Sequence, residues 1–149
     1  MIKRLFNLAA IVLTIALTFH TEFARAEAAW SMRCANLFSC DAETSQCQLA
    51  ITVYGRASTQ GSWVGILGVP TGWSRVTIRV AKGATNQTKT IQGPQLPRMA
   101  FGDVSIRDLL LAGESAQIEI FIGDQVAKSC HISLEGLAHT YEAMRQRIK

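Results

Sequence analysis

The sequence predicts a mainly β fold, an antiparallel β-sandwich with one short internal helix and a C-terminal helix. Three observations lead to this prediction. Short runs of alternating apolar and polar residues, separated by turn residues, fill most of the chain after residue 30. Apolar residues at helical spacing are found only near 105–112 and 134–146. Finally, 48% of the 149 residues are hydrophobic and 17% are charged, which is typical of one packed domain.

The first 26 residues have the pattern of a secretory signal peptide. Lys3 and Arg4 form a positive start, an apolar segment covers 5–19, and Ala24-Arg25-Ala26 supplies the small-x-small site that signal peptidase accepts. A second possible site ends at Ala28. The alternative is an uncleaved membrane anchor, but the apolar run is shorter than the roughly 20 residues that a spanning helix needs. We therefore expect cleavage, and a mature protein in the periplasm or medium with no stable membrane span.

Residues 27–149 are expected to form a single domain. This part contains 12 basic and 10 acidic side chains, so its net charge is only about +2. The basic residues are scattered and form no run like the basic arms that bind nucleic acid. The composition therefore speaks against a nucleic-acid partner.

Strands are expected wherever the period-two pattern occurs between turn residues. The expected strands of the first part are 30–34, 47–54, 63–69, 74–80 and a short edge strand at 88–91. The polar stretch 36–46 is expected to be a hairpin loop between the first two strands. Pro94 and Pro97 end the edge strand, because proline cannot donate to a ladder of hydrogen bonds.

The pattern then changes to helix and returns to strand. Ser105-Ile-Arg-Asp108 fits the Ser-x-x-Asp form of a helix start, and Gly113 is placed to end this helix. Strands are expected at 116–122 and 125–132, joined by a turn at 123–124. Ser133 is expected to cap a last helix whose apolar residues form one stripe that packs against the sheet. The stripe consists of Leu134, Leu137, Tyr141, Met144 and Ile148.

Four cysteines in an exported protein indicate two disulfides. The spacing Cys-x5-Cys-x6-Cys is not that of a zinc site, and the chain has no Cys-x-x-Cys redox motif. If strands 30–34 and 47–54 form a hairpin, Cys34 and Cys47 lie near the same rung, within disulfide range. Cys40 at the loop tip is then free to reach Cys130. The expected pairs are Cys34–Cys47 and Cys40–Cys130.

The sequence carries no motif that predicts a reaction. A Gly-x-Ser-x-Gly elbow, a His-Glu-x-x-His site and a phosphate-binding glycine loop are all missing from it. We expect His131 to face opposite to Cys130 on its strand and His139 to lie in solvent. Asp103 and Asp108 could form a carboxylate pair, but a loop residue and a helix-start residue are the simpler interpretation. The sequence therefore predicts no catalytic residue, no cofactor and no metal.

Several segments resemble invasion-associated locus B proteins. Trp30-Ser-Met-Arg-Cys34 resembles the Trp-x-x-x-Cys opening of that family, and Gln46-Cys47-Gln48 resembles the start of its next strand. The stretch 104–113 looks like the short helix of the family, which ends in glycine, and 118–122 like its following strand. The stretch 132–144 is similar to its closing Ser-Leu-x-Gly-Phe-x-x-Ala-Tyr segment.

This resemblance implies a non-enzymatic exported protein. The family occurs mainly in alphaproteobacteria, some of its members are linked to invasion of host cells, and it has no established catalytic residues. By resemblance, we expect a disulfide-linked β-sandwich that acts on a protein partner at the cell envelope or on a host. The alternative is a periplasmic inhibitor or assembly factor that binds another envelope protein.

Overall fold

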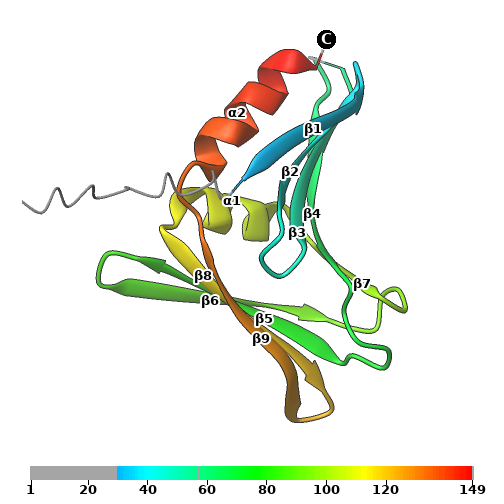
Figure 1. Ribbon diagram of the computed structural model, residues 1–149, viewed down its shortest axis with the longest axis vertical. Helices are drawn as coiled ribbons and strands as arrows, with labels where there is room; N and C mark the ends of the chain where they lie inside the picture. Colours follow the sequence, from blue (N-terminus) through cyan, green and yellow to red (C-terminus); the bar gives the residue numbers. More distant parts are fainter. Residues whose placement is uncertain (1–29, 57, 149) are drawn as a thin grey trace, which may run out of the picture.

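The computed structural model describes residues 30–56 and 58–148, which form two antiparallel sheets with two helices (Figure 1). The predicted fold class, a mainly β protein with one internal and one C-terminal helix, is thereby confirmed. The predicted signal peptide, residues 1–26, lies outside the described residues.

Nine strands and two helices follow one another along the described residues. The strands are β1 (Ser31–Asn36), β2 (Ser39–Thr44), β3 (Leu49–Tyr54), β4 (Gly61–Leu67), β5 (Arg75–Lys82), β6 (Thr85–Gln92), β7 (Met99–Gly102), β8 (Ser115–Ile122) and β9 (Gln125–Ser133). The helices are α1 (Val104–Ala112), between β7 and β8, and α2 (Leu137–Arg147), after β9. Neither α1 nor α2 has the length and apolarity that a membrane-spanning helix needs.

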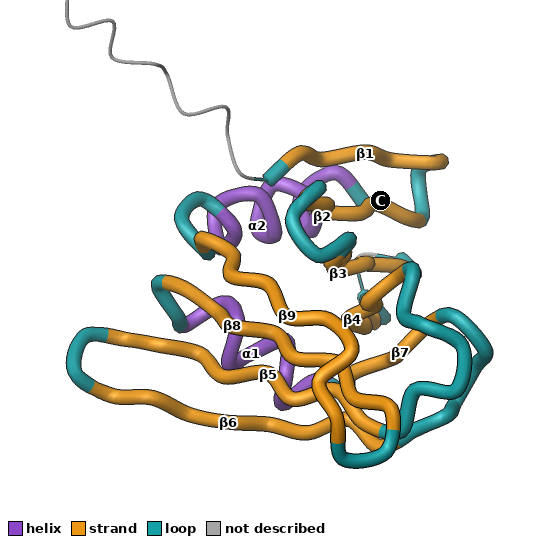
Figure 2. The backbone as a smooth tube through the Cα atoms, turned by 60° about the horizontal axis from the view of Figure 1, so that its bottom comes forward, coloured by secondary structure: helices purple, strands orange, loops and turns teal. Residues whose placement is uncertain are grey.

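The strands form two layers. One sheet has the order β1-β2-β3-β4-β7 and the other the order β6-β5-β8-β9, and every neighbouring pair is antiparallel. The layers converge near β7 and diverge on the opposite side, where α1 and α2 lie between them (Figures 1 and 2). Apolar residues from both inner faces and both helices form one core there. On β5, Val76, Ile78 and Val80 are buried while Arg79 is exposed, as the alternation predicted.

The C-terminal helix α2 packs its apolar stripe into the core. Four members of the stripe, Leu134, Leu137, Met144 and Ile148, are at most 4% exposed, and Tyr141 is partly buried. The predicted docking of this helix against the sheet is confirmed. The predicted cap is wrong, because the N-cap is Gly136 with φ of 81°, in the left-handed region that glycine adopts without strain. The Ser133 hydroxyl instead accepts the Glu135 N–H at 3.3 Å.

The internal helix α1 starts two residues earlier than the sequence predicted. Asp103, not Ser105, is the N-cap: its Oδ1 accepts the backbone N–H groups of Ser105 at 2.9 Å and Ile106 at 3.2 Å. The Ser105 hydroxyl also donates to Asp103 Oδ1 at 2.7 Å. Ser105 therefore supports the cap and does not form it. The helix ends at Gly113, as predicted, although Gly113 has an extended backbone with φ of −89°.

Asp103→Ala is expected to lower the free energy of unfolding by about 1 kcal/mol at pH 7. The hydrogen bond from the Ser105 side chain, followed by that from the Ile106 backbone, holds the pKa of Asp103 below its ordinary value of 3.8. A lowered pKa stabilises the folded state above pH 3.8, and this stabilisation is lost as the pH falls through the folded-state pKa. Urea unfolding of both proteins at pH 7 and at a series of pH values below about 4 tests this.

Asp103→Asn is the matched control, since asparagine keeps an acceptor oxygen but does not titrate. It should cost less than the alanine change at pH 7. A stability gap between the wild type and Asp103→Ala that stays constant through the acid range would contradict the titration argument.

The predicted disulfide pairs are wrong in both cases. The structure joins Cys34 to Cys40 and Cys47 to Cys130. The reason lies in residues 36–46, which were expected to be a loop. The chain reverses already at 37–38, and 39–44 forms strand β2, so Cys40 lies directly opposite Cys34 in the hairpin. Cys47 then belongs to the turn that leads into β3.

The Cys47–Cys130 disulfide connects the two layers. Cys47 precedes β3 of the five-stranded sheet, whereas Cys130 lies on β9 of the four-stranded sheet, and their Cα atoms are 6.0 Å apart. Cys47 and Gln48 both have positive φ, 60° and 52°. This left-handed turn directs the chain from β2 into β3 beside the disulfide.

Candidate functional site

The five-stranded sheet has one face that neither helix covers. α2 packs against β1, β2 and β3 on the inner side, where Ala42 and Ile51 are fully buried. The residues before and after these point the other way, because side chains alternate along a strand. We call this side the outer face. Its residues, from β1 to β7, are Ser31, Arg33, Ser39, Asp41, Glu43, Ala50, Thr52, Tyr54, Gly61, Trp63, Gly65, Leu67, Met99 and Phe101.

Three aromatic side chains lie on the outer face. The rings of Trp63 and Phe101 meet edge to face, with centroids 5.0 Å apart and an interplanar angle of 71°. Tyr54 is 46% exposed, and the apolar side chain of Leu67, at the other end of β4, is 36% exposed. Outward positions of a sandwich are normally polar, so an aromatic group at this place indicates a contact surface.

Two glycines make room for these rings. A Cβ at Gly61 would lie 2.6, 2.7 and 2.8 Å from Cζ, Oη and Cε2 of Tyr54. Because the three distances are nearly equal, the phenol ring lies face-on over the backbone of Gly61. A side chain at Gly65 would collide with the six-membered ring of Trp63. The rings therefore lie against the backbone of the sheet and do not project far from the outer face.

Polar side chains continue the same surface toward β1. Arg33 Nη2 donates to Glu43 Oε1 at 2.6 Å, and Thr52 Oγ1 donates to Asp41 Oδ1 at 2.6 Å. Asp41 lies opposite Arg33 on one side and Thr52 on the other, and Thr52 lies opposite Trp63. A row of charged, hydroxyl and aromatic groups thus crosses four strands.

A hollow of about 400 Å³ lies beside this row. Arg33, Glu43 and Gln48 line its polar side, and Ala50 and Leu67 line its apolar side. The small side chain of Ala50 forms part of its wall on β3. The volume is within the range of about 300–1,000 Å³ that small-molecule sites occupy.

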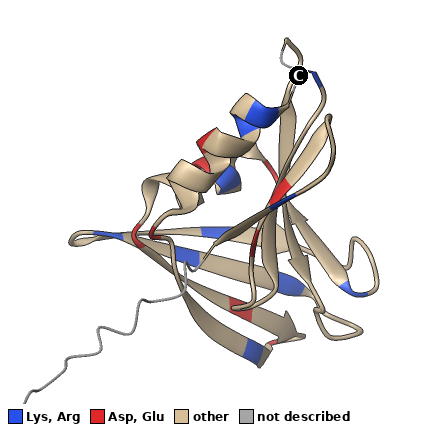
Figure 3. Cartoon of the chain, turned by 45° about the horizontal axis from the view of Figure 1, so that its top comes forward, with Lys and Arg blue, Asp and Glu red and all other residues tan. Residues whose placement is uncertain are grey.

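The outer face carries little net charge. Arg33 is its one basic residue, with Asp41 and Glu43 as the two acidic ones. Elsewhere, Lys and Arg are spread over both sheets and α2 and do not gather on one side (Figure 3). The outer face is therefore not built to attract a polyanion.

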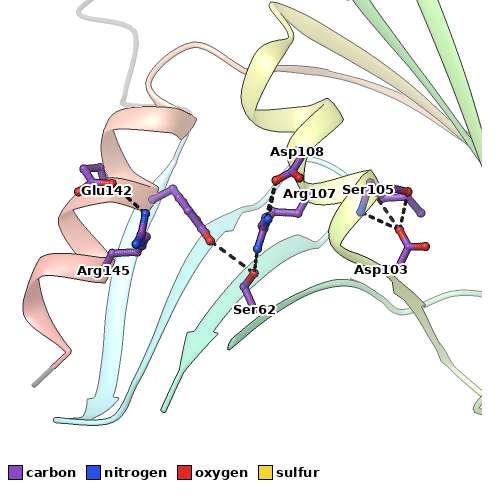
Figure 4. Close-up of polar contacts among 9 residues, drawn as sticks. Ser62, Asp103, Ser105, Arg107, Asp108, Glu142 and Arg145 are labelled. Carbon is purple, nitrogen blue, oxygen red and sulfur yellow. Dashed lines mark hydrogen bonds and ion pairs between the residues drawn. The ribbon is translucent and has the colours of Figure 1, made fainter. Parts of the chain in front are cut away.

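A second polar cluster lies where α1 and α2 meet the start of β4 (Figure 4). Arg107 Nη1 donates to Ser62 Oγ at 2.5 Å, while its Nε and Nη2 donate to Asp108 Oδ1 at 2.8 and 2.6 Å. The Tyr141 hydroxyl donates to the same Ser62 oxygen at 3.4 Å. Every nitrogen of the guanidinium has a protein partner, so Arg107 joins the two helices to β4 rather than awaiting a ligand.

A second hollow, about 450 Å³, lies between β6 and α1. Lys82, Gln87 and Lys89 line one side, and Asp108 and Leu109 line the other. No aromatic side chain lines it. The outer face combines aromatic rings with fixed polar pairs and is therefore the stronger candidate.

The residues considered for catalysis do not come together in one site. Asp103 caps α1 and Asp108 pairs with Arg107. His131 lies opposite Gln117 and is exposed, whereas Cys130 lies opposite the buried Ile118, as expected from alternation. His139 is exposed on α2, also as predicted. In residues 30–56 and 58–148, no group of three His, Cys, Asp or Glu side chains could hold a metal ion.

One signal of the outer face is present in the sequence but was not used in the strand predictions. The run 63–69 is continuously apolar rather than alternating, which already indicates that both faces of β4 are apolar. The part played by Phe101 could not be inferred, because the short strand β7 was not predicted. Comparison with protein-family models, curated proteins and solved structures finds no match to this chain.

Proposed function

We propose that this chain is an exported, non-enzymatic protein that binds a partner at the cell envelope or on a host through the outer face of its five-stranded sheet. The observation that carries the proposal is the aromatic group of Tyr54, Trp63 and Phe101 on a sheet face that no helix covers. Exposed apolar groups of this kind, bordered by polar residues, mark interaction sites.

Four further features support the proposal. The leader, residues 1–26, has the pattern of an export signal. Two disulfides are compatible with an oxidising compartment. The resemblance of Trp30–Cys34 and of 132–144 to invasion-associated locus B proteins implies an envelope or host role. Asp103 and Asp108, the carboxylates considered for catalysis, each have a structural partner.

Site-specific photocrosslinking in intact cells tests the proposal. A benzoylphenylalanine at position 67, on the outer face, should give a covalent adduct under ultraviolet light. The same group at position 126 is the matched control, because Val126 is 49% exposed on the other sheet, compared with 36% for Leu67. Adducts of equal yield from both positions, or from neither, would contradict the proposal.

Protein and adducts recovered from the same cells also test export and the alternative function. N-terminal sequencing of the recovered protein should give Glu27 or Ala29. Full-length protein found only in the membrane fraction would contradict export. An adduct with one periplasmic protein would favour the inhibitor or assembly factor, whereas an adduct with a surface or host component would favour the envelope or host role.

A further inference from the structure

We propose that the outer face binds a neutral glycan, with sugar rings stacked on Tyr54 and Trp63 and sugar hydroxyls hydrogen-bonded by Arg33, Asp41 and Glu43. This inference rests on the proposed function, because it names the chemistry that the same face recognises. It is carried by three features of that face, which are the position of the rings, the fixed polar pairs and the low net charge.

The rings present the surface that a sugar ring needs. One side of a pyranose ring carries mainly C–H groups, which pack against an aromatic face. Tyr54 lies face-on over Gly61, so one side of its phenol ring contacts the backbone, and the residue remains 46% exposed. Trp63 bends over Gly65 and is held edge to face by Phe101. The rings are thus positioned before a ligand arrives, which reduces the entropic cost of binding.

The distance between the rings favours an oligosaccharide over a single sugar. Gly61 and Gly65, under the two rings, are four residues apart on β4. At about 3.3 Å per residue, this separation is roughly 13 Å. One sugar ring does not reach across it, but a short glycan chain does.

The polar pairs supply directional hydrogen bonds at the edge of the aromatic group. Arg33 and Glu43 hold each other at 2.6 Å, and Thr52 holds Asp41 at the same distance. In each pair one carboxylate oxygen takes part in the hydrogen bond, and the other has capacity for a sugar hydroxyl. Hydrogen bonds to ionised groups are stronger than neutral ones. The hollow of about 400 Å³ between Arg33 and Leu67 accommodates such a sugar unit.

The charge of the face distinguishes a glycan from other occupants. Asp41 and Glu43 outnumber Arg33, so the face disfavours anionic lipid and nucleic acid. Protein interfaces have cores depleted of charged residues, whereas here the charged row reaches the aromatic group directly. Few polar groups beside an apolar surface are the usual composition of a small-ligand site.

Titration of the mature protein with neutral oligosaccharides tests the inference. The probes are hexamers of N-acetylglucosamine, of β-linked glucose and of α-linked glucose. Trp30 and Trp73 are 4% and 0% exposed, so a change in tryptophan emission reports on Trp63. At least one hexamer should bind with a Kd below about 1 mM, as measured by emission and by calorimetry.

Five variants assign the binding to the outer face. Trp63→Ala should weaken binding about 30-fold, and Trp63→Phe should restore part of it. Phe121→Ala is the matched control for the ring, because Phe121 is an aromatic residue of similar partial burial opposite Arg75 on the other sheet. Glu43→Gln should weaken binding about tenfold, whereas Glu119→Gln on β8 should leave it unchanged.

The results separate this inference from the proposed function. If no hexamer binds, or if Trp63→Ala and Phe121→Ala weaken binding equally, the glycan inference is overturned. A face-specific photoadduct from position 67 that protease removes and glycosidase does not would identify a protein partner. The proposed function would then stand without the glycan. If position 67 gives no photoadduct in cells although the mature protein binds a hexamer, the proposed function is overturned instead.

Discussion

Replacing both Cys47 and Cys130 by serine is expected to lower the free energy of unfolding by about 4.5 kcal/mol. This disulfide closes a loop of sequence separation 83, and its removal releases that loop in the unfolded chain. In the chain-entropy model the cost rises with loop length. Guanidinium unfolding of the oxidised proteins, followed by fluorescence, measures the difference.

Replacing Cys34 and Cys40 together is the matched control. That disulfide has a sequence separation of only 6, so the same model expects a loss of about 2 kcal/mol. Both changes remove one disulfide and leave no free thiol. Equal losses would contradict the loop-length argument, and non-reducing peptide mapping that yields a Cys34–Cys47 peptide would contradict the connectivity itself.

The geometric rule behind the disulfide prediction was correct, but the strand it was applied to was wrong. Cysteines directly opposite each other in an antiparallel hairpin do pair. The error was the loop assigned to 36–46, whose polar Ser39, Asp41 and Glu43 are the outward half of an alternating strand. Its inward half, Cys40 and Ala42, is too small to give a strong apolar signal. The extra strand moved Cys47 away from Cys34 and toward Cys130.

The elements with strong periodicity were predicted well. β5, β8 and β9 lie within one or two residues of their expected bounds, and 88–91 is part of the longer edge strand β6. By contrast, β7 has four residues and follows two prolines, so no local pattern marked it. The candidate site depends on it, because Phe101 reaches Trp63 only through the pairing of β7 with β4. Local periodicity does not determine which distant strands pair with each other.

Ending the chain after Ser133, so that α2 is removed, is expected to cause unfolding or aggregation. The removed segment includes Leu134, Leu137, Met144 and Ile148, which are at most 4% exposed. Burial of each such side chain contributes about 1.5–3 kcal/mol, so the sum is comparable with the whole stability of a domain, roughly 5–15 kcal/mol. Gel filtration and near-ultraviolet circular dichroism of the truncated protein provide the test.

Single substitutions in the full chain show whether packing of α2 is the cause. Leu137→Ala is expected to lower the free energy of unfolding by about 2–5 kcal/mol, because Leu137 is fully buried between α2 and the inner face. His139→Ala, two residues away on the exposed side of the same helix, should change it by less than about 0.5 kcal/mol. A truncated protein that stays monomeric with unchanged melting would mean that the two sheets close without α2. The inner faces diverge on that side (Figure 1), so without the helix their apolar side chains would be left facing water.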